Sequence, residues 1–190
     1  MNILVLQGSP RKQGNTAMLV DHLCRALAGH GRKPEVVRLA GLDIHPCIGC
    51  GHCEQDGECV FRDGMVPLLE KIVRADRIVL ASPVYFYGVT AQCKVAIDRC
   101  QALWSRKYVL GRTGTRPGKV KKGYLLSVAA TRGDRVFDGV ILTARYALDA
   151  MDCRYSGELL VRGVDKPGAI LKREKDLARA ADFARTVAAP

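Results

Sequence analysis

The feature that most constrains the fold is the alternation of short apolar runs with amphipathic segments along the chain. Residues 2–7 (NILVLQ) predict a buried strand, and an amphipathic helix is expected from Asn15 or Thr16 to the glycines at 29–31. Later strands are expected at 35–39, 76–81, 123–129 and 153–161. Later helices are expected at 64–74, 89–103 and 166–187, and one more helix follows the turn at 131–134 and ends at residue 150. This alternation is typical of an α/β fold with a parallel sheet covered on both faces.

The expected order of the strands predicts where a ligand binds. Five strands in this alternation suit the doubly wound order 2-1-3-4-5, in which right-handed crossovers bring the carboxyl ends of strands 1, 3 and 4 together. The loops at residues 8–16, 82–88 and 130–134 leave those ends, so we expect a ligand site among them. A chain of 190 residues is expected to form one domain over residues 1–190.

Composition narrows the class of protein. No stretch approaches the roughly 18 consecutive apolar residues that a membrane helix needs, and the N-terminus lacks the basic region and cleavage site of a secretory signal. We therefore expect a soluble cytoplasmic protein without a membrane partner. In that reducing compartment, eight cysteines favour metal binding or redox chemistry over disulfides.

The charge is strongly positive and unevenly distributed. The net charge is +11, and residues 99–122 contain eight basic residues and no acidic one. We expect a basic loop at about residues 105–122. Two interpretations remain open: a solvated loop or oligomer contact, or a docking surface for an acidic partner or a cofactor phosphate.

The loop at residues 8–16 (GSPRKQGNT) joins a buried strand to a helix N-terminus, where unpaired N–H groups and the helix dipole favour a phosphate. The side chains that could assist are Ser9, Arg11, Lys12, Asn15 and Thr16. Neither the G-x-x-x-x-G-K-[ST] pattern nor a G-x-G-x-x-G fingerprint is present, which favours a monophosphate ligand. A helix cap without a ligand is the alternative.

The other two loops suggest a flat ligand. Tyr85, Phe86 and Tyr87 are consecutive in the turn SPVYFYG and cannot all face the core, so at least one ring is expected to contact a planar group such as an isoalloxazine. An aromatic plug packed on neighbouring loops is the alternative. In the third loop, ATRGD, Thr131 and Gly133 could contact the polar edge of the same ring.

A compact cysteine motif lies in a loop at about residues 44–61. Cys47, Cys50, Cys53 and Cys59 follow the spacing C-x2-C-x2-C-x5-C. Structural zinc usually takes two separated pairs of ligands, whereas four thiolates within thirteen residues suit a 4Fe-4S cubane. We favour the cluster over zinc and over free or disulfide-bonded thiols. The remaining cysteines, predicted to be small core residues, are Cys24, Cys93, Cys100 and Cys153.

These motifs make the chain similar to a known family. The segments GSPRKQGNT, ADRIVLASPVYFYGVTAQCK with the following IDR, and the turn at 131–134 resemble the NADPH-dependent FMN reductase-like branch of the flavodoxin superfamily. The motif CIGCGHCEQDGEC resembles the iron-sulfur flavoproteins of anaerobic microbes. The resemblance implies a flavodoxin-like fold and a homodimer or homotetramer. It also implies that the phosphate is held by Ser9, Arg11, Asn15 and Thr16, and that the ring is lined by Pro83, Val84, Tyr85, Phe86, Tyr87, Gly88, Thr131 and Gly133.

The expected function is that of a flavin-dependent oxidoreductase. FMN exchanges two electrons and a cluster exchanges one, so we expect electron transfer among FMN, a 4Fe-4S cluster and a ferredoxin-like carrier or small acceptor. We assign no catalytic side chain. The alternative is an NAD(P)H-dependent FMN or quinone reductase without a cluster. A zinc-bearing nucleic-acid-binding module is a remote third hypothesis, because it leaves the three loops without a purpose, and we expect no nucleic-acid partner.

Overall fold

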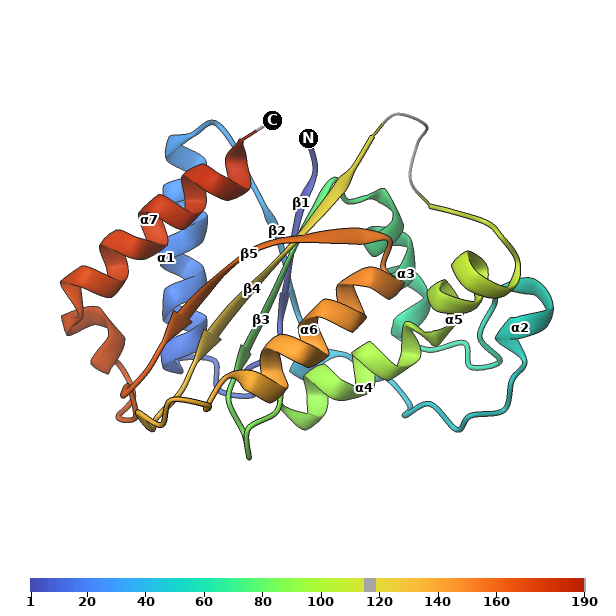
Figure 1. The fold of residues 1–190 in the computed structure, drawn as a ribbon, viewed down its shortest axis with the longest axis horizontal. Coiled ribbons are helices and arrows are strands. Elements are labelled where there is room, and N and C mark those ends of the chain that lie inside the picture. Colours follow the sequence, from blue (N-terminus) through green and yellow to red (C-terminus); the bar gives the residue numbers. More distant parts are fainter. Residues whose placement is uncertain (115–118, 190) are drawn as a thin grey trace.

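The computed structural model describes residues 1–114 and 119–189 and contains a five-stranded parallel sheet. The strands are β1 (Ile3–Gln7), β2 (Glu35–Arg38), β3 (Arg77–Pro83), β4 (Lys121–Val128) and β5 (Cys153–Val161). Their order is β2-β1-β3-β4-β5, with every neighbouring pair parallel (Figure 1). The predicted flavodoxin-like, doubly wound topology is confirmed.

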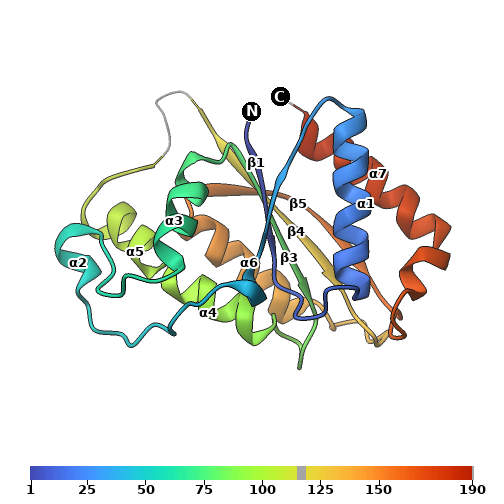
Figure 2. The ribbon, with the colours of Figure 1, turned by 180° about the vertical axis from the view of Figure 1, so that it is seen from behind.

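Helices cover both faces of this sheet. One face carries α1 (Asn15–Gly29) and α7 (Glu174–Ala188), and the other carries α3 (Met65–Arg74), α4 (Ala91–Arg99), α5 (Gln101–Trp104) and α6 (Asp138–Ala150) (Figures 1 and 2). The short elements are η1 (Leu39–Gly41), α2 (Cys53–Asp56), the π-helical turn η2 (Ser105–Val109) and η3 (Ala169–Lys172). Within the described residues, no helix combines the length and apolarity needed to cross a membrane.

The central strands form because both of their faces are buried. Alternate side chains of β1 enter different cores: Val5 packs with Leu19 of α1, and Leu6 packs in the cluster that contains Leu68 of α3. Each fully buried side chain of this size contributes about 1.5–3 kcal/mol of transfer free energy. The edge strand β2 is exposed or half-buried along its length, so the fold is organised around β1, β3 and β4.

Two helices differ from the sequence-based expectation. The helix expected at 89–103 begins at Ala91, where Thr90 caps it by accepting a hydrogen bond from the backbone N–H of Cys93. It then runs past residue 103 through α5 into η2, where we expected a loop. The last helix is interrupted, because Gly168 has a left-handed φ of 76° that an α-helix does not accommodate.

The basic run is more buried than predicted. Arg99 is 1% exposed and forms an ion pair with Asp63, and Lys121 is 6% exposed and donates to the carbonyl oxygens of Ile72 and Met151. Burial lowers the pKa of Lys121. Of the two interpretations left open for the run, a solvated segment or a docking surface, neither describes these two buried side chains. Arg116 lies outside the described residues.

Candidate functional site

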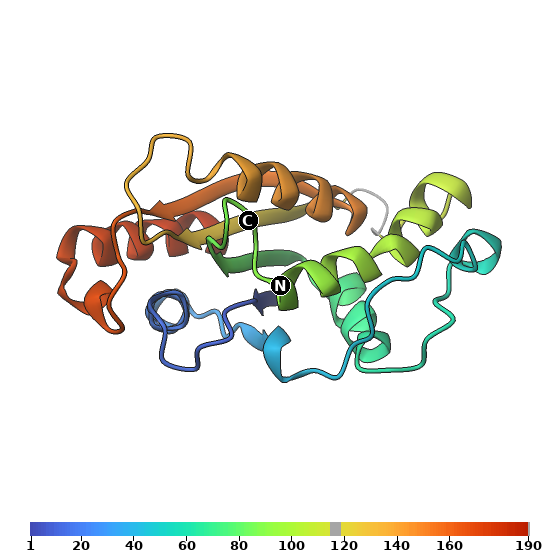
Figure 3. The same ribbon diagram turned by 90° about the horizontal axis from the view of Figure 1, so that it is seen from below.

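The three predicted loops lie together at the carboxyl edge of the sheet, which Figure 3 views from below. The first loop is joined to β3 by the N–H of Gly8, which donates to the carbonyl of Ala81 over 2.7 Å. The hydroxyl of Thr90, at the end of the second loop, donates to the carbonyl of Gly8 over 2.6 Å. These two hydrogen bonds, one between backbone groups and one from a side chain, hold the first loop against β3 and the end of the second loop.

The second loop also contacts the third. The hydroxyl of Tyr87 lies 3.7 Å from the position that a Cβ would take on Gly133. The carbonyl oxygen of Tyr87 fills the space that a Cβ would take on Gly139, in the first turn of α6. The third loop is tied to the segment after β5, because the N–H of Gly163 donates to the carbonyl of Thr131. The structure thus brings the aromatic turn beside Thr131 and Gly133.

The loop expected to bind phosphate leads into an uncapped helix. Gly14 stands at the N-cap of α1, and no side chain caps this helix end. Ser9 and Thr16 are almost fully buried, and Arg11 is exposed. The Ser9 hydroxyl accepts a hydrogen bond from the N–H of Arg11 over 3.3 Å, which shapes the turn. A helix N-terminus without a side-chain cap, next to a cationic side chain, has the chemistry of an anion site.

Asn15 has a structural task that the sequence did not reveal. Its amide nitrogen lies within hydrogen-bonding distance of the carbonyls of Val164, Asp165 and Lys166, at 3.4, 3.4 and 3.0 Å. Its amide oxygen accepts from the N–H of Ile170 over 3.2 Å. The side chain therefore braces the segment after β5.

The aromatic turn adopts a backbone that its residues do not favour. Tyr85 and Gly88 exchange two backbone hydrogen bonds of 2.9 Å around Phe86 and Tyr87, whose φ angles are 48° and 62°. Such a turn normally uses Asn-Gly, because two left-handed residues are required. Placing bulky residues there costs on the order of 1–3 kcal/mol each. Phe86 is fully exposed, so the prediction that the three rings do not all face the core is confirmed. Strain of this kind, retained at an exposed edge, is typical of functional sites.

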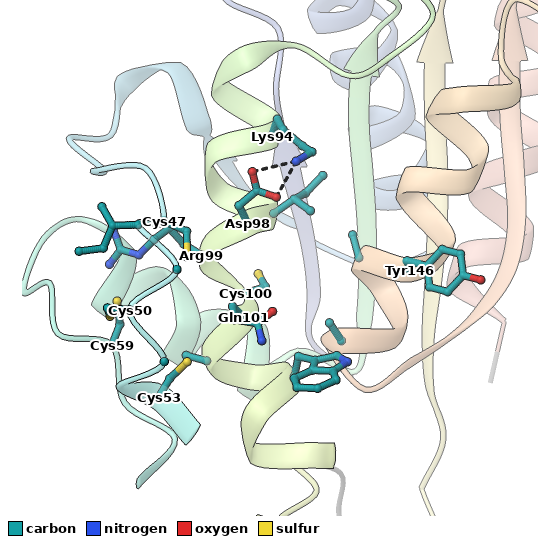
Figure 4. A pocket seen from close by; sticks show the side chains of 18 of the residues that line it. Cys47, Cys50, Cys53, Cys59, Lys94, Asp98, Arg99, Cys100, Gln101 and Tyr146 are labelled. Atoms are coloured by element: carbon teal, nitrogen blue, oxygen red, sulfur yellow. Dashed lines mark hydrogen bonds and ion pairs between the residues drawn. The ribbon is translucent and has the colours of Figure 1, made fainter. Parts of the chain in front are cut away.

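The cysteine loop lies outside the sheet, beside α5 and η2 (Figures 1 and 2). All eight cysteines belong to the described residues, and each is a free thiol. Cys47, Cys50, Cys53 and Cys59 line one cavity of about 860 Å³, whose opposite side is formed by residues of α6 that include Tyr146 (Figure 4).

Within the part of the chain that the structure describes, no three His, Cys, Asp or Glu side chains come together as ligands of a single metal ion. The four thiols share the lining of one cavity.

The cysteines outside this loop behave as predicted, with one difference. Cys93, Cys100 and Cys153 are buried, whereas Cys24 is half-buried. Desolvation raises the pKa of Cys93 and of Cys100 to about 12, so both stay protonated at neutral pH. These thiols are packing groups and are not nucleophiles.

Arginines from the basic run hold the cysteine loop in place. The guanidinium of Arg99 donates to both carboxylate oxygens of Asp63, over 2.6 and 3.1 Å, and to the carbonyl of His45 over 2.7 Å. Arg106 donates to the carbonyl of Gly57 over 2.8 Å and pairs with Glu58. Sequence reasoning missed these supports. The signal was the spacing of seven residues between Arg99 and Arg106, which places both on one helical face.

The contacts of Asp63 lower the pKa of its carboxyl. Burial raises this pKa, but the hydrogen bonds from Arg99 and from the backbone N–H groups of His45 and Met65 outweigh that effect and lower it to about 2. Asp63 is thus a carboxylate at any pH at which the protein is handled. It provides the fixed negative charge that a buried Arg99 requires.

A parallel sheet of this order, with loops gathered at the carboxyl ends of its central strands, defines a flavodoxin-like α/β protein. The family model for NADPH-dependent FMN reductase matches residues 1–141. The chain belongs to the NADPH-dependent FMN reductase family, a family of flavin-dependent oxidoreductases.

The chain is also similar in sequence to curated proteins that are named iron-sulfur flavoproteins. An iron-sulfur flavoprotein of Methanocaldococcus jannaschii is 43% identical over 103 residues, which cover 54% of this chain and 53% of the relative. An iron-sulfur flavoprotein of Archaeoglobus fulgidus is 36% identical over 134 residues, covering 70% and 63%. The chain thus matches between half and two thirds of the length of these relatives.

A solved structure, an FMN-dependent NADH-azoreductase from Bacillus anthracis in complex with FMN, superposes with a TM-score of 0.69. It is 11% identical, and the match covers 99% of this chain and 100% of that one. At this identity the likeness shows the fold alone.

Proposed function

We propose that this protein binds FMN at the three loops of the carboxyl edge and a 4Fe-4S cluster at Cys47, Cys50, Cys53 and Cys59. FMN would supply two-electron chemistry and the cluster one-electron transfer. The protein would exchange electrons between a donor such as NAD(P)H and a ferredoxin-like carrier or small acceptor. Membership in the FMN reductase family supports the flavin, and similarity to iron-sulfur flavoproteins supports the cluster.

The observation that carries this proposal is a helical run, interrupted by a turn at Cys100, that leads from one region to the other. α4 begins three residues after Gly88 of the aromatic turn, extends for about 14 Å at the usual helical rise, and continues through α5 into η2. At its far end, the Ser105 hydroxyl lies 3.4 Å from the sulfur of Cys53. This series of short helices therefore extends from the aromatic turn to the cysteine loop.

At the carboxyl edge, the residues suit one phosphate and one flat ring. The uncapped end of α1 would bind the phosphate, with Arg11 adding charge and Ser9 and Thr16 adding hydroxyl groups. Pro83, Val84, Tyr85, Phe86, Tyr87 and Gly88 would line the ring. Thr131 and Gly133 would complete the site on the side of β4.

The cysteine loop fits a cubane better than a single ion. The irons of a cubane lie at different corners, so its ligands need to surround a small volume and do not need to converge on one point. Four free thiols in the lining of one cavity supply the four sulfur ligands that such a cluster takes. The buried Nε of Arg99 has no hydrogen-bond partner among the described residues, which leaves a donor for a sulfur atom.

We also propose the setting in which the protein acts. Reduced, closely spaced cysteines fit a single-domain cytoplasmic protein, and the family resemblance suggests a homodimer or homotetramer. Arg112 and Lys119 are the residues of the predicted basic loop that remain exposed in the described part of the chain, so an acidic carrier would meet these two.

Purification without oxygen tests the proposal. The visible spectrum would be recorded, with FMN identified by chromatography and with assays of iron, sulfide and zinc. Flavin bands together with broad cluster absorption and about four irons per chain are the expected result. Flavin without iron would favour the NAD(P)H-dependent reductase that lacks a cluster, and a colourless protein would refute both functions.

A further inference from the structure

Two polar side chains of the helical run are buried against the cysteine loop. Arg99 ends α4 and is 1% exposed, and Ser105 begins η2 and is fully buried. Figure 4 shows Arg99 extending from α4 toward the labelled cysteines. Buried polar groups are costly unless they have partners, so the partners of these two define what they do.

The partner of Ser105 is a proposed cluster ligand. Its hydroxyl oxygen lies 3.4 Å from the sulfur of Cys53, and either atom can donate when Cys53 is a thiol. A thiolate bound to iron has no proton, so the serine hydroxyl would then be the donor. The position depends on the π-helical turn that Ser105 begins, and turns of this kind inside helices are frequent at functional sites.

Arg99 keeps its Nε–H donor after its structural contacts. Its two terminal nitrogens bind Asp63 and the carbonyl of His45, and its guanidinium carbon lies 5.1 Å from the centroid of the Phe61 ring. The remaining Nε is buried without a hydrogen-bond partner in the described chain. Arg99 and Cys59 line the same cavity, and the ion pair with Asp63 holds the guanidinium in place.

We infer that Arg99 and Ser105 are positioning residues that present hydrogen-bond donors to the sulfurs of Cys59 and Cys53 and so raise the reduction potential of the cluster. The inference rests on the proposed 4Fe-4S site. Reduction adds one negative charge to the cluster and its thiolates. Donor groups and a fixed cation stabilise the more negative state, which makes reduction easier.

The test is a redox titration of the reconstituted full-length protein, followed by electron paramagnetic resonance of the reduced cluster. Ser105→Ala removes one hydroxyl from a buried position without adding volume. We expect its cluster potential to shift to more negative values, with the FMN content unchanged. Arg99→Lys, which keeps a cation beside Asp63 but removes the Nε donor, is expected to shift the potential in the same direction.

Tyr124→Phe is the matched control. It also removes one hydroxyl, which donates to the carbonyl of Thr186 on the opposite face of the sheet. Its cluster potential should equal that of the parent. If Ser105→Ala and the parent have the same cluster potential, the inference about Ser105 is wrong and the proposed cluster site is unaffected. If the reconstituted parent binds no iron, both the proposed function and this inference are wrong.

Discussion

The carboxyl edge and the cysteine loop are held in place by different kinds of contact. At the edge, backbone groups continue the pairing of the sheet: the N–H of Val84 donates to Val128, and that of Ala129 donates to Val161. The cysteine loop lies beyond the sheet, and side chains anchor it, above all the buried pair of Arg99 with Asp63. The first region is fixed by the topology of the fold, and the second by a few charged residues.

This difference predicts how each region responds to substitution. A site built from backbone groups keeps its shape when one side chain changes, so single substitutions there should change affinity and leave the fold intact. A loop held by a buried ion pair loses its anchor when one partner is removed, because the other charge is then buried alone. The variants below test this contrast.

The largest effect is expected from Cys50→Ala. Cys100 also lines the cavity, but it is 1% exposed and its thiol donates to the carbonyl of Ala96. We therefore expect the cluster to be lost, and iron to fall to background while FMN remains. Turnover with a one-electron carrier should then fall far more than reduction of a two-electron acceptor. Cys24→Ala, a half-buried cysteine of α1, is the control and should keep its iron. Full iron content in Cys50→Ala would exclude this loop as the cluster site.

Arg99→Met should destabilise the protein by about 3–5 kcal/mol, because it leaves Asp63 buried without its cation. The free energy of unfolding in urea measures this. Adding Asp63→Leu should recover part of the loss. Arg74→Met removes an exposed pair with Glu70 and should cost about 0–1 kcal/mol. Equal costs for the two arginine variants would contradict the role given to Arg99.

At the carboxyl edge, Ser9→Ala combined with Thr16→Ala should weaken FMN binding at least about tenfold, since each hydroxyl contributes roughly 1 kcal/mol. Titration of the apoprotein by flavin fluorescence measures the affinity. Iron content should not change. Ser156→Ala, on β5, is the control. An unchanged affinity in the double variant would remove this loop from the flavin site.

Replacing Phe86 by Asn and Tyr87 by Gly supplies the residues that the turn geometry prefers. We expect the apoprotein to gain about 2 kcal/mol of stability or more, because Asn and Gly adopt the left-handed conformation at both positions with less strain. FMN affinity should fall, because two proposed ring contacts are lost. Unfolding in urea and flavin titration separate the two effects. A variant that is no more stable than the parent would show that the turn is not strained.

The smallest effect is expected in the acid dependence of stability. The pKa of Asp63 is lowered from 3.8 to about 2 in the folded protein, so its contribution is complete above about pH 4 and is lost as the pH falls toward 2. Asp63→Asn cannot titrate and should show a shallower loss over this range. Urea unfolding at several pH values measures the slopes. Parallel slopes would mean that this carboxyl has an ordinary pKa.

Much of the fold could be predicted because its signals are local. The strand expected at 153–161 is β5 (Cys153–Val161), and the helix expected from Asn15 is α1. Apolar periodicity is visible within ten residues of sequence, and strand order follows from the handedness of the crossovers. The gathering of the three loops at one edge is a consequence of that order.

The basic run could not be interpreted in the same way. Arg99 pairs with Asp63, 36 residues away, and Lys107 pairs with Asp149, 42 residues away. Sequence shows that residues 99–122 are rich in positive charge, but it does not show which acids will face them. The burial of these cations depends on pairs that form only when distant helices pack.

The amino-acid sequence by itself determined the alternating elements, the loops at the sheet edge and the spacing of the four cysteines. The tertiary structure decided which of the polar side chains remain for a ligand. Asn15 was predicted to contact a phosphate, yet its side-chain amide forms hydrogen bonds with backbone groups of residues 164–170, about 150 positions away. Arg99 looked like surface charge and is an anchor of the cysteine loop. Local patterns specify backbone conformation, whereas a polar side chain takes its partner from whatever the folded chain brings within hydrogen-bonding distance.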